Sequence, residues 1–281
     1  MASFECDQAE GLRRMLAGPK PRIFTFFSAT SIAEKSAMLV NLGASLSAGG
    51  NHVVLLDACT SEQGIVHRID DDTNTRATLV DVARQQRALN QVVRRMPQGF
   101  GLASLTRGSV RSTTQYDADQ VRRVGNTFAV LASQTDILII DAELDGEDHF
   151  SSPIIANSEI VIQVAPGAAS IKNAYTVIKR LNDRLGRRPF GILVTASNEQ
   201  EAQKIYQNMA KTASRYLAIQ LSYVGAIPSD EYTTRAARLG RAVTDAFPLA
   251  VASVAFRHLA QHFSLSTGST VLAANRAELG A

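Results

Sequence analysis

The chain has 281 residues, of which 45% are hydrophobic and 20% charged, a composition ordinary for a globular protein. A net charge of +3 with scattered arginines does not indicate a nucleic-acid-binding protein, so we expect no strong DNA binding. Two cysteines, Cys6 and Cys59, exclude a disulfide framework and fit a reducing compartment. The N-terminus lacks the apolar core of a signal peptide, and no apolar run reaches the ~18 residues of a membrane span. We therefore expect a cytoplasmic protein.

The first feature in chain order is a short segment at residues 1–18. Within it, Leu12, Met15 and Leu16 recur at helical spacing and would share one face of a helix. Residues 18–21 (GPKP) then interrupt the chain, because proline cannot continue a helix. The apolar face of this segment either packs on the protein's own core or binds a partner.

The main body, residues 22–266, alternates short apolar runs with longer amphipathic stretches, and a flexible tail is expected at 267–281. Most of the apolar runs are nearly continuous, as in strands buried on both faces of a parallel sheet. The predicted strands are 23–27, 53–58, 101–105, 136–141, 160–164, 190–195 and 222–227, and helices are predicted at 37–48, 170–185 and 199–217. This alternation predicts an α/β fold with a doubly wound, mostly parallel sheet and helices on both faces.

The loop at residues 28–36 is the first place to look for a ligand, since open α/β sheets bind ligands beyond the carboxyl ends of their strands. Lys35 and Ser36 open the predicted helix, where a lysine reaches phosphates and a hydroxyl binds Mg²⁺. The glycines of a phosphate cradle are missing, however, and the Glu34 carboxylate would repel a polyphosphate. From this local motif alone, an ordinary strand–loop–helix connection is favoured over a nucleotide site.

Two aspartates, Asp57 and Asp141, each end an apolar strand. An aspartate in this position can simply cap the following loop, or it can belong to a metal site at the edge of the sheet. Cys59 follows closely, and we interpret it as a buried small residue because neither His nor Lys stands beside it in the sequence.

Several collinear segments resemble the MinD/ParA family of P-loop ATPases. The matching segments are 28–36 with the family's SGKGGVGKT loop, 53–59 (VVLLDAC) with VLLLDAD, 136–141 with the Walker B strand, and 165–170, 201–202, 215–217 and 223–230 with its later pattern. At the N-terminus, residues 7–13 (DQAEGLR) look like the DQAxxLR segment of the flagellar-number regulators FlhG and FleN. The resemblance is therefore strongest to that subfamily.

The resemblance implies a P-loop NTPase fold with ATP or ADP and Mg²⁺ as cofactors. The residues it assigns to the cofactor are Lys35, Ser36, Pro228 and Asp230, with Ser36 and Asp141 as Mg²⁺ ligands if nucleotide binds.

The departures from the family pattern fall where catalysis would take place. Thr30 replaces a lysine that reaches across the dimer, Cys59 replaces a switch aspartate, and Ser31, Ile32 and Glu34 replace the loop glycines. Asp57 and Asp141 would then be vestigial catalytic residues. Each lost charge should lower a phosphoryl-transfer rate by roughly 10²–10³-fold.

The resulting hypothesis is a regulator of flagellar number or assembly that acts by protein interaction, with a degenerate nucleotide site and little or no ATP hydrolysis. The alternative is an active MinD/ParA-like ATPase that cycles with nucleotide and membrane. The partners implied by the resemblance are a flagellar transcription activator and an FlhF-like GTPase, the latter contacted through Asp7, Gln8, Leu12 and Arg13. We expect weak membrane attachment at most, and recruitment to the cell pole or membrane by a partner.

Overall fold

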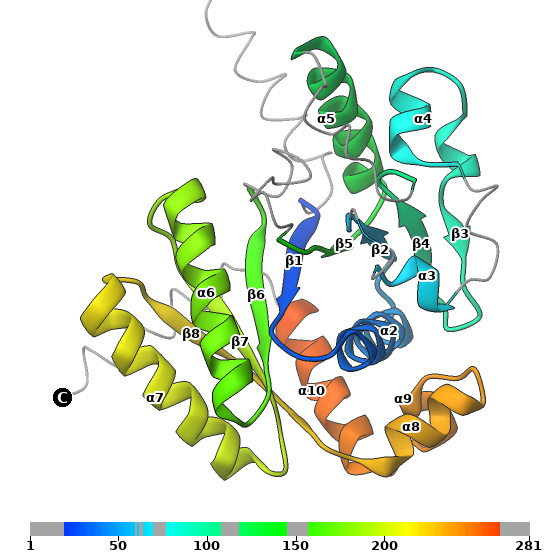
Figure 1. Cartoon of the computed structure of the whole chain (residues 1–281). Coiled ribbons are helices and arrows are strands. Elements are labelled where there is room, and N and C mark those ends of the chain that lie inside the picture. Colours follow the sequence, from blue (N-terminus) through cyan, green and yellow to red (C-terminus); the bar gives the residue numbers. More distant parts are fainter. Residues whose placement is uncertain are drawn as a thin grey trace, which may run out of the picture.

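The computed structural model describes residues 20–59, 61, 64–69, 77–107, 118–144 and 157–264. The predicted N-terminal segment (1–18) and tail (267–281) lie outside these residues. Within them, eight strands form one sheet in the order β3-β4-β2-β5-β1-β6-β7-β8, and only β3 runs antiparallel to its neighbour (Figure 1). The strands are β1 (Arg22–Ser28), β2 (Val53–Asp57), β3 (Arg94–Arg95), β4 (Gly101–Ser104), β5 (Ile137–Asp141), β6 (Glu159–Val164), β7 (Phe190–Ala196) and β8 (Leu221–Pro228).

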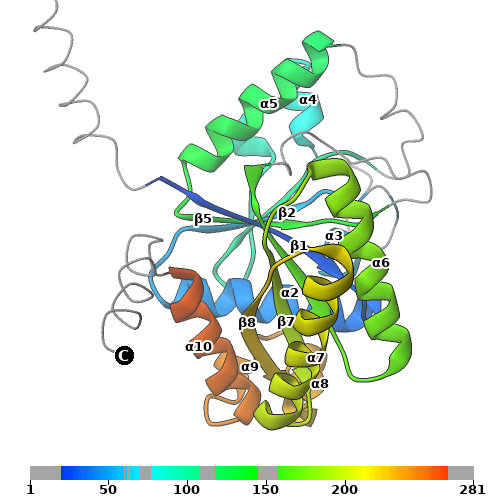
Figure 2. The same ribbon diagram turned by 90° about the vertical axis from the view of Figure 1, so that its left-hand side faces the viewer.

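Helices cover both faces of the sheet (Figure 2). They are α2 (Ile32–Ala48), α3 (Val66–Ile69), α4 (Leu79–Ala83), α5 (Ala118–Ser133), α6 (Ala168–Leu185), α7 (Glu199–Leu217), α8 (Glu231–Arg238), α9 (Val243–Ala246) and α10 (Val251–Ser264), with a short 3₁₀ turn at Leu89–Gln91. One face carries α2, α8, α9 and α10, whereas α4 and α5 cover β2, β4 and β5 on the other face and α6 and α7 cover β6 to β8. None of the helices in this part of the chain is long and apolar enough to span a bilayer.

Burial on both faces explains why the strands read as continuous apolar runs. In β2, Val53 and Leu55 pack toward α2 and α10, while Val54 and Leu56 pack toward α4 and α5. Successive side chains of a strand point to opposite faces, so positions 53–56 of β2 all need an apolar residue. The predicted doubly wound α/β fold is confirmed.

The antiparallel edge strand β3 was not predicted. It consists of two exposed arginines, Arg94 and Arg95, which pair with Leu102 and Gly101 of β4. Its residues carry no apolar pattern, because a two-residue edge strand buries neither face.

The topology indicates a ligand site at the carboxyl ends of the parallel strands. Strands β1 and β5 are neighbours, and the chain leaves β1 toward β2 but leaves β5 toward β6, on the other side of β1. Such a reversal opens a crevice at the carboxyl ends of the strands. Asp57 and Asp141 end β2 and β5, and they are partners in the pairing register of these strands.

Candidate functional site

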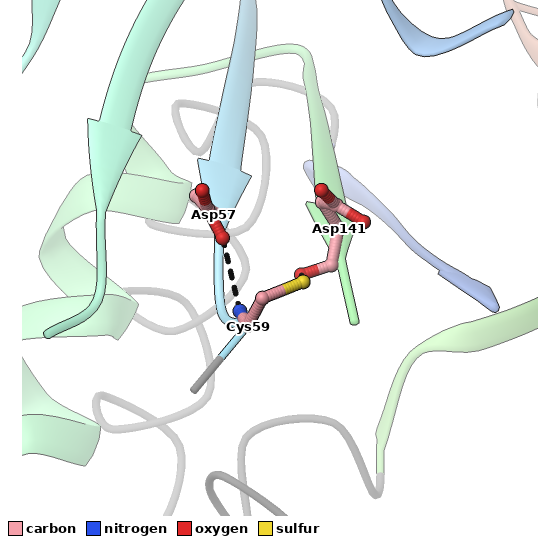
Figure 3. A group of neighbouring side chains, drawn as sticks. All are labelled: Asp57, Cys59 and Asp141. Carbon is pink, nitrogen blue, oxygen red and sulfur yellow. Dashed lines mark hydrogen bonds between the residues drawn. The ribbon is translucent and has the colours of Figure 1, made fainter. Parts of the chain in front are cut away.

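Two carboxylates and a thiol form the centre of the site at this edge. Asp57, Cys59 and Asp141 are all buried, and each offers a ligand atom within 4.8 Å of the others (Figure 3). Burial, reinforced by the charge of Asp141, raises the pKa of Asp57 to about 7. Burial likewise raises the pKa of the Cys59 thiol, so the thiol is the protonated form near neutral pH.

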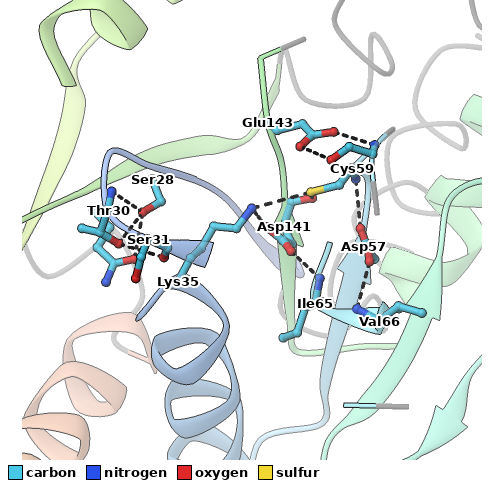
Figure 4. A network of polar contacts seen from close by, with 12 residues as sticks. Ser28, Thr30, Ser31, Lys35, Asp57, Cys59, Ile65, Val66, Asp141 and Glu143 are labelled. Carbon is cyan, nitrogen blue, oxygen red and sulfur yellow. Dashed lines mark hydrogen bonds and ion pairs between the residues drawn. The ribbon is translucent and has the colours of Figure 1, made fainter. Parts of the chain in front are cut away.

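Lys35 reaches this cluster from α2. Its Nζ lies 2.7 Å from Asp141 Oδ1 and donates to Cys59 Sγ at 3.6 Å (Figure 4). Burial acts to lower the pKa of Lys35, but the charge of Asp141 outweighs it and raises that pKa above its usual value. Burial also raises the pKa of Asp141, which opposes ionisation of that carboxyl. The 2.7 Å contact between two groups shielded from water favours the charged pair.

The chain following β2 folds back over both carboxylates. The Ile65 amide donates to Asp141 Oδ2 at 2.8 Å, and the Val66 amide donates to Asp57 Oδ2 at 2.9 Å. The Cys59 amide donates to the other Asp57 oxygen at 3.0 Å. Within the described chain, Asp141 Oδ1 accepts no hydrogen bond by geometry but pairs with the Lys35 ammonium. Each of the four carboxylate oxygens thus has a hydrogen-bond or ion-pair partner within the described residues.

Gly64 permits the close approach of this loop. A Cβ atom at this position would lie 2.1 Å from Asp57 Oδ2, far inside van der Waals contact. Nearby, Ser61 donates from its amide and from its hydroxyl to Glu143, each at 2.7 Å. The loop is thus tied to the ends of both β2 and β5.

The start of α2 differs from the sequence-based expectation. The helix was predicted to begin at residue 37, directly after Lys35 and Ser36, but it begins at Ile32. Ser31 caps it: Ser31 Oγ accepts from the Glu34 amide at 3.3 Å, while the Glu34 carboxylate accepts from the amide and hydroxyl of Ser31 at 3.0 and 2.7 Å. This reciprocal capping box satisfies N–H groups that a phosphate would otherwise bind. Lys35 is consequently the fourth residue of the helix rather than its opening.

The other residues predicted to bind a cofactor are Ser36, Pro228 and Asp230. Ser36 is buried, and its hydroxyl has no hydrogen-bond partner within the described chain. Pro228 ends β8, and Asp230 accepts from the amides of Tyr232 (2.9 Å) and Ala252 (3.1 Å), which joins the start of α8 to that of α10. Their assignment to a cofactor stays a prediction. The partner-binding candidates Asp7, Gln8, Leu12 and Arg13 lie outside the described residues.

Sequence reasoning missed two features of the site. The proximity of Lys35 to Cys59 had no signal, because 24 positions separate them and only the tertiary fold brings them together. The capping box did have a signal, the Ser-x-x-Glu spacing of Ser31 and Glu34. That spacing was interpreted as a substituted phosphate loop instead.

Comparisons with known proteins agree with this architecture, although no family model matches the chain. The antiactivator FleN of Pseudomonas aeruginosa is 30% identical over 228 residues, which cover 81% of this chain and 80% of that protein. A ParA family ATPase from Chlorobium tepidum superposes with a TM-score of 0.61 at 18% identity, covering 86% of this chain and 98% of the other. The septum site-determining protein MinD from Pyrococcus horikoshii, complexed with Mg-ADP, gives 0.59 at 18% identity, with 85% and 94% covered. The solved structures confirm the predicted MinD/ParA-type fold.

Proposed function

The chain belongs to the FleN family of MinD/ParA-type proteins, and on that premise we propose that it regulates flagellar number or assembly through protein contacts, with little or no ATP hydrolysis of its own. The flagellar role rests on the 30% identity to FleN, and the proposed lack of hydrolysis rests on the buried contact between Lys35 and Asp141. A lysine that serves a nucleotide must face the phosphates, whereas this ammonium is directed to a carboxylate of its own chain.

Three arrangements support a site that does not fit Mg-nucleotide. The amides of Ser31 and Glu34 at the start of α2 donate within the capping box, and the Glu34 carboxylate adds negative charge where phosphates would lie. Lys35 neutralises Asp141. The oxygens of Asp57 accept backbone amides, so a metal ion would have to compete with these contacts.

A biochemical experiment tests the absence of turnover. Purified protein is titrated with Mg-ATP and Mg-ADP by calorimetry, and phosphate release is followed for the wild type and for Ser36→Ala. Because the Ser36 hydroxyl has no hydrogen-bond partner in the described chain, this substitution should leave the fold intact. We expect phosphate release at background for both proteins. A clear rate that Ser36→Ala abolishes would identify an active, Mg²⁺-dependent ATPase, the alternative function, and would overturn the proposal.

A cellular experiment tests the regulatory role. Deletion of the gene in its host should change the number of flagella per cell, counted by electron microscopy. The wild type and Ser36→Ala should both restore the normal number. An unchanged number after deletion would contradict the flagellar role, whatever the nucleotide experiment gives.

The partners follow from the family. Since the Pseudomonas relative is named an antiactivator, we assign a flagellar transcription activator as a partner. We further assign an FlhF-like GTPase as the partner of the N-terminal segment, with Asp7, Gln8, Leu12 and Arg13 as contact residues, and recruitment to the cell pole through such a partner.

A further inference from the structure

A groove lies at the amino ends of the parallel strands, at the end of the sheet opposite Asp57 and Asp141. It has a volume of about 1130 Å³ and is walled by the C-terminal end of α2, the turn between β3 and β4, the turn between α8 and α9, and one face of α10. Asn51 and His52 precede β2, and Gly101 begins β4, so the groove lies where the parallel strands begin. It is therefore separate from the site at the carboxyl ends.

The groove carries positive charge. Arg95, Arg241 and Arg257 line it, and Asp245 is the one acidic residue among the described residues of its lining. Asp245 is paired with Arg241 at 2.7 Å. Arg257 donates to the neutral carbonyl of Pro248, and Arg95 has no ion-pair partner within the described chain, so two cationic charges stay uncompensated. An anionic ligand would supply the missing counter-charges.

Polar groups of the lining also lack partners. The hydroxyls of Ser45 and Ser47 and the Oε1 atom of Gln98 are buried without a hydrogen bond in the described structure. Ser45 itself is only 4% exposed. Buried polar atoms usually have a partner, and a ligand rich in donors and acceptors would provide one after small side-chain rotations.

The main chain around the groove is accessible. Gly50 and Gly240 have φ angles of +88° and +65°, and no atom lies within 4 Å of where their Cβ atoms would be. Arg95 belongs to β3, which forms the edge of the sheet in the described part of the chain. An open edge strand beside accessible backbone is suited to pairing with an extended chain.

We propose that this groove binds an extended acidic segment of a partner protein. Its volume of about 1130 Å³ lies near the upper end of the roughly 300–1,000 Å³ of small-molecule sites and has room for a short peptide. Three arginines, one of them already paired with a carboxylate, are few for nucleic acid, whose binding neutralises many phosphates. The biological identity of the partner rests on the proposed function. The binding of an acidic segment does not, because it follows from the charge and shape of the groove.

The test uses the full-length protein and a fluorescein-labelled ten-residue peptide that alternates Glu with Ser, followed by fluorescence anisotropy. We expect saturable binding that weakens with salt, and a loss of affinity of about tenfold or more in Arg95→Glu/Arg257→Glu. The matched control is Arg187→Glu, the same charge reversal at an exposed arginine in the turn after α6, which does not line the groove. It should bind like the wild type.

Thermal unfolding of each variant verifies that the exposed substitutions leave the fold intact. Absence of binding to the wild type, or equal weakening by the control, would overturn the proposal. So would a labelled DNA duplex that binds more tightly than the peptide and loses its affinity in the same double variant. Flagellar counts test the proposed function separately, so a protein that controls flagella without binding the peptide would refute the groove alone.

Discussion

At the scale of single residues, the buried ion pair decides how Lys35 should respond to substitution. Lys35→Met leaves the Asp141 carboxylate without its cation in a site shielded from water. We expect the free energy of unfolding to fall by about 3–5 kcal/mol, measured by urea denaturation. Lys35→Met/Asp141→Asn should recover much of this loss, because the asparagine is neutral and still accepts from the Ile65 amide. Additive losses in the double variant would contradict the pairing.

The stability of the protein should depend on pH because of Asp57. Its pKa is about 7 in the folded protein and 3.8 ordinarily, so between these values the folded state binds more protons than the unfolded state. The stability contributed by this group is therefore full below about pH 4 and is lost as the pH rises through about 7. The loss is measured as the difference between the free energies of unfolding in urea at pH 5 and at pH 8. Asp57→Asn, which does not titrate, should lose less stability between these two values than the wild type, and equal losses would refute the assignment.

At the scale of elements, the loop that follows β2 makes a testable contribution through Gly64. A methyl group there would collide with Asp57 Oδ2, so the loop must move away and its amide bonds to the carboxylates must lengthen. We expect Gly64→Ala to destabilise the protein by about 1–3 kcal/mol in urea unfolding.

The matched control for Gly64 is Gly125→Ala in α5, where no atom lies within 4 Å of the added Cβ. Alanine favours a helix over glycine, so this control should stabilise the protein by up to about 1 kcal/mol. A neutral effect of Gly64→Ala would mean that the loop does not close over the carboxylates in solution.

The elements also show how far sequence reasoning extends. The predicted strand 136–141 corresponds to β5 within one residue, because a strand buried on both faces needs an uninterrupted apolar run. Asp57 and Asp141 were each predicted to end a strand, and the pairing of β2 with β5 in the structure brings them together. The helix α2 begins at Ile32 rather than at residue 37 because Ser31 and Glu34 form a capping box, whereas the resemblance to a phosphate loop places the helix start after Ser36. The contact of Lys35 with Cys59 depends on the packing of α2 against the sheet, which no linear pattern encodes.

At the scale of the whole molecule, the two ends of the described fold are joined. Arg22 begins β1 and donates to the carbonyl of Phe263 at 2.7 Å, near the end of α10, and its guanidinium also pairs with Glu159 at 2.9 Å. The body is thus anchored from residue 22 onward. Deleting residues 1–18 removes none of these contacts and should leave the unfolding midpoint nearly unchanged.

The N-terminal segment should act on the proposed GTPase partner. A helix of this length is marginal alone and gains stability when its apolar face, with Leu12, is buried in a groove. Gln8 and Arg13 lie off that face of the predicted helix and are the candidates for polar contact near the partner's nucleotide. A peptide of residues 1–20 should therefore accelerate GTP hydrolysis by the cognate FlhF-like GTPase, measured as phosphate release.

Substituting Gln8→Ala or Arg13→Ala in the peptide should weaken this stimulation, whereas Ser3→Ala, outside the predicted helix, serves as the control and should not. The deletion of residues 1–18 separates the two hypotheses for the segment. If the peptide has no effect on hydrolysis and the deletion unfolds the body, the apolar face packs on the protein's own core. If the deletion leaves the fold intact and abolishes stimulation, the segment acts on the partner.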